Sequence, residues 1–242
     1  MTRWKASGIH FSISLMIGIA AFCLLYFVYF PQPYFQAAGA GKLVLILLGV
    51  DVILGPLLTL VVFKSGKKTL KFDLASIGIL QIAALSYGLH IMWVARPVFI
   101  VAAVDRIELV YANNLEEADL AKGIGHFAKR SLTGPEFVGV AFPTDAKEIL
   151  DLRESALNGK DIQFMPRYYR KWDTSVTQAL LKRAIPTSSL PAKAQVAVKQ
   201  YQANHPGKEI ALIPLRGRIG DYTLVLDATT GAQLVALNAA PW

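Results

Sequence analysis

The chain has 242 residues, of which 54% are hydrophobic and 17% are charged. A typical soluble domain is about 45–50% apolar and about 25% charged, so this composition argues against a soluble globular protein and against a disordered one. The single cysteine excludes an intramolecular disulfide and a zinc site built on several thiolates. The mean hydropathy of +0.41 instead points to membrane-spanning segments.

Three long apolar runs account for this excess. They cover residues 9–30, 43–63 and 72–94, and their only charged residues are Asp51 and Asp73. Each run is long enough to cross a hydrocarbon core of about 30 Å at about 1.5 Å per residue, so we expect three transmembrane helices. Cleavage of the first run as a signal peptide is an alternative, although that run is longer than the usual apolar region of about 7–15 residues.

Lysine and arginine are divided unequally between the two ends of these helices. Six of them precede the first helix or lie in the loop at residues 64–71, whereas Lys42 alone lies between the first and second helices. The positive-inside rule therefore predicts a multi-pass membrane protein with a cytoplasmic N-terminus and an exported segment after Arg96, which in a Gram-negative bacterium lies in the periplasm.

The net charge of +8 follows the same division. Residues 1–96 carry +6 of it, and residues 97–242 carry only +2. The positive charge is thus mainly a signal of orientation and an attraction to anionic membrane lipids. Because the exported part is nearly balanced in charge, we expect no nucleic-acid partner.

Residues 97–242 form the second expected domain, a periplasmic α+β domain that follows the three-helix transmembrane domain of residues 1–96. Runs of β-branched residues predict strands at its two ends, and capping residues before periodic apolar segments predict helices in its middle. The expected strands cover residues 98–104, 107–111, 137–142, 210–215, 222–226 and 234–237, and the expected helices cover residues 115–122, 145–157, 173–183 and 191–204.

The sequence lacks a recognisable constellation for catalysis or metal binding. The four histidines follow no ligand spacing, and neither a Gly-x-Ser-x-Gly elbow nor a phosphate-binding glycine pattern occurs. We therefore expect no catalytic residues, no metal and no cofactor.

Asp51 is the residue that most needs a partner, because a carboxylate near the middle of a membrane costs about 2.5–3.5 kcal/mol. Asp73 lies about 16 Å away in depth at about 1.5 Å per residue, too far to share a proton with it. Gln81 lies at a more similar depth and is the expected partner between the second and third helices, with contact to another membrane helix as the alternative. Gly55 and Pro56 follow Asp51, and the proline should bend the helix, which suits either a docking surface or internal packing.

Residues 164–172 are dense in aromatic and basic side chains. Tyr, Trp and Arg are enriched at protein interfaces, so one expectation is an exposed partner contact at Arg167, Tyr168, Tyr169 and Trp172. A core-packed loop whose basic groups reach solvent is the alternative.

Several segments together resemble the TfpX/TfpZ family of type IV pilin accessory proteins. The most specific is LGVDVILGPLLTL at residues 48–60. The others are WKASGIH at 4–10, Asp73-Leu74, Gln81 and ALSYG at 84–88 in the third helix, ARP at 95–97, VDR at 104–106, DYTLVLD at 221–227 with Thr230-Gly231, and the closing Pro241-Trp242.

The resemblance implies an inner-membrane accessory factor, without catalytic activity, that binds one major type IV pilin and promotes its stability and assembly. The implied partners are the transmembrane helix and periplasmic head of that pilin, other pilus assembly machinery and membrane lipids. A separate physical hypothesis is that Asp51 shares a proton with an acidic residue near the start of the pilin helix or accepts a hydrogen bond from the N-terminal amine of that helix. A membrane-anchored enzyme that modifies pilin or an envelope component is the alternative function.

Overall fold

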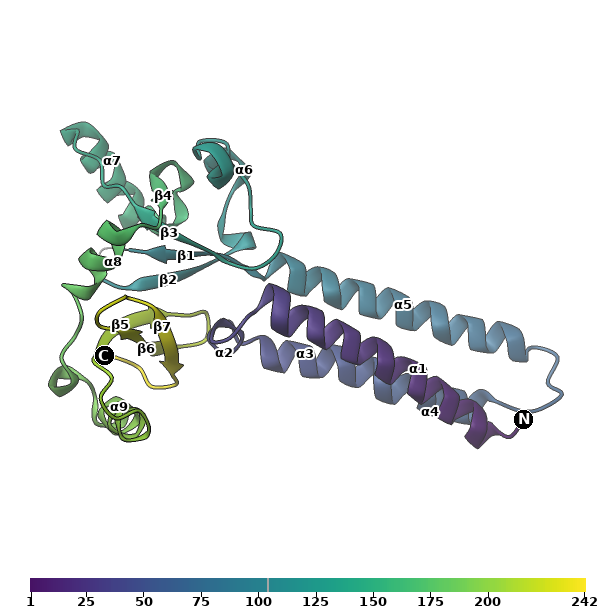
Figure 1. Cartoon of the computed structure of the whole chain (residues 1–242). Helices are drawn as coiled ribbons and strands as arrows, with labels where there is room; N and C mark the ends of the chain where they lie inside the picture. The colour runs from purple at the N-terminus through teal and green to yellow at the C-terminus, as the bar shows by residue number, and fades with distance from the viewer. Residues whose placement is uncertain (104) are drawn as a thin grey trace.

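The structure is a computed structural model that describes residues 1–103 and 105–242. Three long helices lie side by side, and a mixed α+β domain is attached to one end of them (Figure 1). The N-terminus and the loop between the second and third long helices lie together at the opposite end. This arrangement agrees with the predicted order of an apolar helical part followed by an α+β part.

Three helical segments are long and apolar enough to cross a membrane, as predicted. The first is α1 (Arg3–Cys23), continued by the π-helical Leu24–Tyr29; the second joins α3 (Ala40–Gly49), the π-helical Val50–Leu54 and α4 (Gly55–Val62); the third is α5 (Leu70–Val94). The first helix begins earlier than the apolar run, because the Thr2 side chain caps it by accepting a hydrogen bond from the Lys5 amide.

The second span packs against both of the others. Polar contacts join α4, the C-terminal half of this span, to α1: Ser7 Oγ donates to the Pro56 carbonyl at 2.9 Å, and His10 Nδ1 lies 2.6 Å from Thr59 Oγ1. Nearer the sheet domain, Gly18 of α1 leaves room for Val52, so this small residue permits close approach of the two helices.

One seven-stranded mixed sheet organises the α+β domain, in the order β4-β3-β1-β2-β5-β6-β7. The β1–β3 and β2–β5 pairs are parallel, and the remaining pairs are antiparallel. The strands are β1 (Pro97–Ala102), β2 (Ile107–Tyr111), β3 (Glu136–Val140), β4 (Tyr169–Lys171), β5 (Ile210–Arg216), β6 (Asp221–Asp227) and β7 (Gln233–Leu237).

Both faces of the sheet are covered. The connection between α1 and α3, which contains α2 (Tyr34–Ala37), shares one core cluster with α8 (Thr174–Leu181). On the other side, residues of α6 (Glu117–Leu120) and α7 (Ala146–Leu157) pack with β1 and β3, and α9 (Ala192–Asn204) packs with β5 and β6.

Most of the predicted elements are confirmed, although several of their bounds differ from the prediction. The expected strand at 98–104 ends at Ala102, and residue 104 lies outside the described residues. The helix expected at residues 115–122 is present only as the single turn of α6. Strand β4 lies within the aromatic and basic stretch, where only three residues pair with β3, too few to show a periodic pattern.

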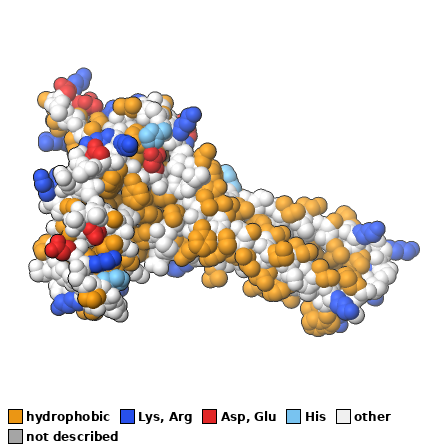
Figure 2. Space-filling view, viewed as in Figure 1, with side chains coloured by type: hydrophobic (Ala, Val, Ile, Leu, Met, Phe, Trp, Pro, Cys, Tyr) orange, Lys and Arg blue, Asp and Glu red, His pale blue; other side chains and the backbone are white. Residues whose placement is uncertain are grey.

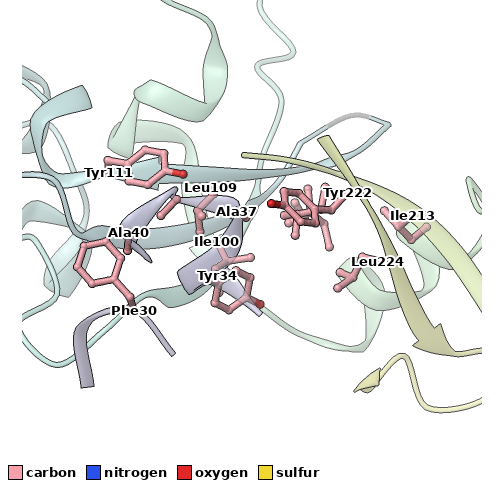
Figure 3. Close-up of a cluster of buried hydrophobic side chains, with 14 of the residues drawn as sticks. Phe30, Tyr34, Ala37, Ala40, Ile100, Leu109, Tyr111, Ile213, Tyr222 and Leu224 are labelled. Atoms are coloured by element: carbon pink, nitrogen blue, oxygen red, sulfur yellow. The ribbon is translucent and has the colours of Figure 1, made fainter. Parts of the chain in front are cut away.

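The connection between α1 and α3 joins the helical bundle to the sheet. Figure 3 shows Tyr34 and Ala37 beside Ile100 and Leu109 of the sheet, and Phe30, which belongs to the same cluster, beside Ala40. Ala37 is fully buried, its carbonyl accepts from the Arg218 amide at 2.9 Å, and Tyr34 donates to Gln233 Oε1 at 2.5 Å. Burial raises the pKa of Tyr34, so this phenol stays protonated and remains a donor.

This connection is the first of two joints between the helices and the sheet domain. The second joint is Arg96, which follows α5 and is only 2% exposed. Its guanidinium stacks over the Trp93 ring at 3.5 Å and donates to the carbonyls of Trp93 at 2.7 Å and Ser131 at 2.9 Å. Desolvation lowers the pKa of Arg96, but an arginine remains charged, so the two carbonyls and the indole face stabilise a buried cation.

Ala37→Leu tests the first joint. The added carbons have no free volume between α2 and the sheet, so we expect a loss of about 1–3 kcal/mol in the free energy of unfolding. Thermal unfolding of the detergent-solubilised protein measures it. Ala203→Leu on the exposed side of α9 is the control and should leave the midpoint unchanged; an equal midpoint for both variants would contradict a packed joint.

Candidate functional site

The main hollow among the apolar helices is a groove between the second span and α5. It has a volume of about 350 Å³, and nearly all of its lining is apolar. Figure 2 shows hydrophobic side chains along the visible face of these helices, as a lipid-facing bundle requires. The polar residues of the groove are Asp51, Gln81 and, towards the sheet, Tyr87.

Asp51 and Gln81 meet in this groove, which confirms the predicted polar clasp. Gln81 Nε2 donates to Asp51 Oδ1 at 2.8 Å and to the Asp51 carbonyl at 3.0 Å. Asp51 is only 6% exposed, and its second carboxylate oxygen has no hydrogen-bond partner among the described residues. The site therefore retains an acceptor in an apolar setting, where an unused acceptor is costly.

The local backbone explains why the Asp51 carbonyl is available. Residues Val50–Leu54 form a π-helical turn, in which a carbonyl accepts from the amide five residues later. For Asp51 that residue is Pro56, which has no N–H to donate. Gln81 supplies the missing donor from α5, so the proline and the glutamine act together.

Gly55 makes this contact possible, because a Cβ at this position would lie 2.0 Å from Gln81 Nε2. A side chain would displace the glutamine from Asp51. The predicted site residues Asp51, Gly55, Pro56 and Gln81 are thus brought together in one place, and their role toward a partner stays a prediction.

Gly55→Ala should therefore destabilise the bundle, although alanine favours a helix more than glycine does by about 1 kcal/mol. Displacing Gln81 removes its hydrogen bonds to the Asp51 carboxyl oxygen and carbonyl, and a buried acceptor left without its partner costs about 1–3 kcal/mol. Gly49→Ala in the same span has no atom within 4 Å of its new Cβ and is the matched control. A lower thermal midpoint for Gly55→Ala and an equal or higher one for Gly49→Ala are expected; equal midpoints would contradict the clasp.

The aromatic and basic stretch is mostly not exposed, so the expectation of an exposed contact is wrong for two of its members. Tyr168 is 6% exposed and Tyr169 is 3% exposed. The Tyr169 ring meets Phe99 and Phe127 edge to face, and its hydroxyl donates to the Gln163 carbonyl. Burial raises the pKa of Tyr169, which keeps this donor protonated.

Of the four predicted contact residues in this stretch, Arg167 and Trp172 are half-buried. Arg167 places its guanidinium 4.6 Å from the Tyr168 ring centre. Trp172 donates from Nε1 to Thr177 Oγ1 at 3.0 Å and meets the ring of Phe137 at 5.4 Å. Phe137 is 39% exposed and is not among the predicted contact residues. Side chains alternate between the two faces of a strand, so the sequence could have placed Phe137 on the face that Val138 does not occupy.

Tyr169→Ala should cost about 3–5 kcal/mol, because it removes a large ring from the core. Arg167→Ala should cost less than about 1 kcal/mol, because its cation–π contact is partly exposed to solvent. Near-UV circular dichroism during thermal unfolding compares them. Equal destabilisation by the two substitutions would contradict the different burial of these neighbours.

The described residues contain no group of three or more His, Cys, Asp or Glu side chains placed to hold a metal ion. His10 and His126 each contact a side chain, Thr59 and Glu136 respectively, and His205 contacts the Tyr201 carbonyl. Among the described residues of the helical part, the Asp51–Gln81 clasp is thus the polar contact that lies in the apolar groove.

These features define a class: an α+β protein carried on three helices that are long and apolar enough to span a membrane, with a polar clasp inside an apolar groove. Comparison with known proteins then identifies the family. A fimbrial assembly protein of Dichelobacter nodosus serogroup I is 30% identical over 247 residues, which cover 97% of this chain and 96% of that relative. The chain belongs to the family of fimbrial assembly proteins.

Other relatives agree with this assignment. The fimbrial assembly protein of D. nodosus serogroup E1 is 29% identical over 97% of this chain and 96% of its own length. That of serogroups C1 and C2 is 36% identical over 44% of this chain and 82% of its own length. The family model for the fimbrial assembly protein FimB matches residues 1–39, and no solved structure matches. These relatives support a role in fimbrial assembly. They do not identify the chain as a member of the TfpX/TfpZ family in particular.

Proposed function

We propose that this protein is an inner-membrane accessory factor that binds a specific major type IV pilin and promotes its stability and its assembly into pili. The family membership supports a role in fimbrial assembly, since its relatives are named for that role. The observation that carries the binding proposal is the apolar groove with an unpaired carboxylate oxygen at Asp51. We propose no catalytic step.

The proposed orientation places the N-terminus and the loop at residues 64–71 in the cytoplasm and residues 97–242 in the periplasm. Its support is the gathering of basic side chains at the end of the bundle that lies away from the sheet (Figure 2). The sheet domain would then lie on the side of the membrane where the pilin head is held before assembly.

The groove suits a transmembrane helix that carries one hydrogen-bond donor. Asp51 is the twelfth residue of the 23-residue span Ala40–Val62, so the donor would lie near the middle of the bilayer. Leu80 and Ile46 line the groove and are more than 60% exposed, so a partner helix would find apolar surface on both sides of the acid. The partner donor would be a protonated acid or the N-terminal amine of the pilin helix.

We propose that Arg167 and Trp172 contact the pilin head. Tyr168 lies in the core beside Arg167, whereas Trp172 packs against the core cluster on the other face of the sheet. Phe137 joins this surface through its ring contact with Trp172. The half-buried arginine and tryptophan have the composition of interface anchors.

Asp51→Ala should weaken co-purification of the pilin about tenfold, because one hydrogen bond to a charged group contributes about 1.5 kcal/mol or more. The measurement is quantitative recovery of pilin with the tagged protein from membranes, together with the number of pili per cell. A photo-crosslinker at position 172 should trap the pilin head, and one at position 80 should trap the pilin transmembrane helix in the groove.

Asp73→Asn is the matched control for the acid, because Asp73 lies at the cytoplasmic end of α5 and pairs with Lys67 at 2.7 Å. It should leave pilin recovery unchanged. Unchanged recovery with Asp51→Ala would contradict the groove as the binding site, and a chemically modified pilin that disappears on deletion of the protein would instead indicate an enzyme.

A further inference from the structure

Two loops of the sheet domain extend to the level where the apolar helices end. The first is the segment between residues 129 and 135, which runs beside the start of the sheet next to α5 (Figure 1). The Ser131 carbonyl accepts from Arg96 at 2.9 Å. A Cβ at Gly134 would lie 2.6 Å from the Val28 carbonyl, so this loop touches the end of the first span.

The second loop is the β5–β6 turn at residues 217–220. The Arg218 amide donates to the Ala37 carbonyl at 2.9 Å, and a Cβ at Gly39 would lie 2.6 Å from Ile219 Cγ2. Gly39 adopts a φ of +70°, so it is suited to this close approach at the start of the second span. This loop therefore touches the start of that span.

Each loop presents one large apolar side chain to the outside. Leu132 is 65% exposed and Ile219 is 64% exposed. One exposed apolar residue needs no explanation, but these two lie on separate loops that both contact the same ends of the membrane helices. Exposed basic residues, Lys129 and Arg218, lie within three residues of them in the sequence.

The same level carries the aromatic residues that are typical of a membrane interface. Tyr29, at the end of the first span, meets Trp93, near the end of α5, at 5.1 Å between ring centres. Tyrosine and tryptophan are enriched where the hydrocarbon core meets the headgroups. Apolar tips with neighbouring basic groups match the same zone, because the tips enter the acyl boundary and the cations face anionic headgroups.

We propose that Leu132 and Ile219 insert into the headgroup region of the bilayer, so that the sheet domain rests on the membrane that anchors it. The partner of this surface is the lipid of the outer face, with anionic headgroups facing Lys129 and Arg218. The proposal rests on the membrane insertion proposed above and is independent of pilin binding.

A fluorescent label placed by cysteine chemistry tests it in nanodiscs that contain anionic lipid. Cys23 is first replaced by serine, because it is exposed on α1. Labels at positions 132 and 219 should show blue-shifted emission and quenching by a lipid with a nitroxide on its headgroup. They should be protected from a water-soluble quencher.

Three control labels make the result decisive. Leu157 on α7 and Val196 on α9 are 90% and 64% exposed, on helices that lie away from the bundle (Figure 1). Labels there should respond only to the water-soluble quencher. Ile82 is 67% exposed within α5, and a label there should respond to a nitroxide placed in the acyl chain.

Each pattern of quenching has one meaning. If the label at 82 is quenched in the acyl region but those at 132 and 219 behave like 157 and 196, the lipid contact is wrong and membrane insertion stands. If the label at 82 also responds only to the aqueous quencher, the insertion itself is wrong. Leu132→Asp and Ile219→Asp, with the label at the other loop, should reduce headgroup quenching there; unchanged quenching would also overturn the proposal.

Discussion

The burial of residues 30–40 against the sheet is the contact on which the rest of the structure depends. A chain with three long apolar helices ahead of an α+β domain could carry that domain on a loose linker. Here the link between the first two spans is itself part of the sheet core, with Phe30 and Tyr34 among its most buried side chains. Together with Arg96 after α5, it fixes the helices to the sheet at two points.

The clasp inside the bundle follows from a different constraint, the cost of unused hydrogen-bonding groups in an apolar medium. Pro56 removes a donor, the π-helical turn leaves the Asp51 carbonyl without one, and Gln81 supplies it across the helix interface. One carboxylate oxygen remains unused among the described contacts. This oxygen is the basis of the partner contact proposed for the groove.

The sequence allows the apolar helices, most strands and the Asp51–Gln81 contact to be predicted, because each depends on residues within one run or at matched depth. It does not reveal that α2 lies in the sheet core, since four helical residues carry no periodic signal. The sequence also does not show whether Tyr168 and Tyr169 are buried in the core or exposed at an interface. Aromatic residues mark cores and interfaces alike, and only the rings of Phe99 and Phe127 decide between them.

A rigid connection has a consequence for the proposed function. A pilin would present one continuous molecule, with a helix in the membrane and a head outside it, and each part would contact a separate surface of this protein. If the two surfaces moved freely, binding at one would add little to binding at the other. Because the two joints hold the sheet at a fixed position relative to the groove, the second contact forms at a high effective concentration once the first is made. The joints, rather than either surface alone, would then determine how tightly a pilin is held and which pilin fits.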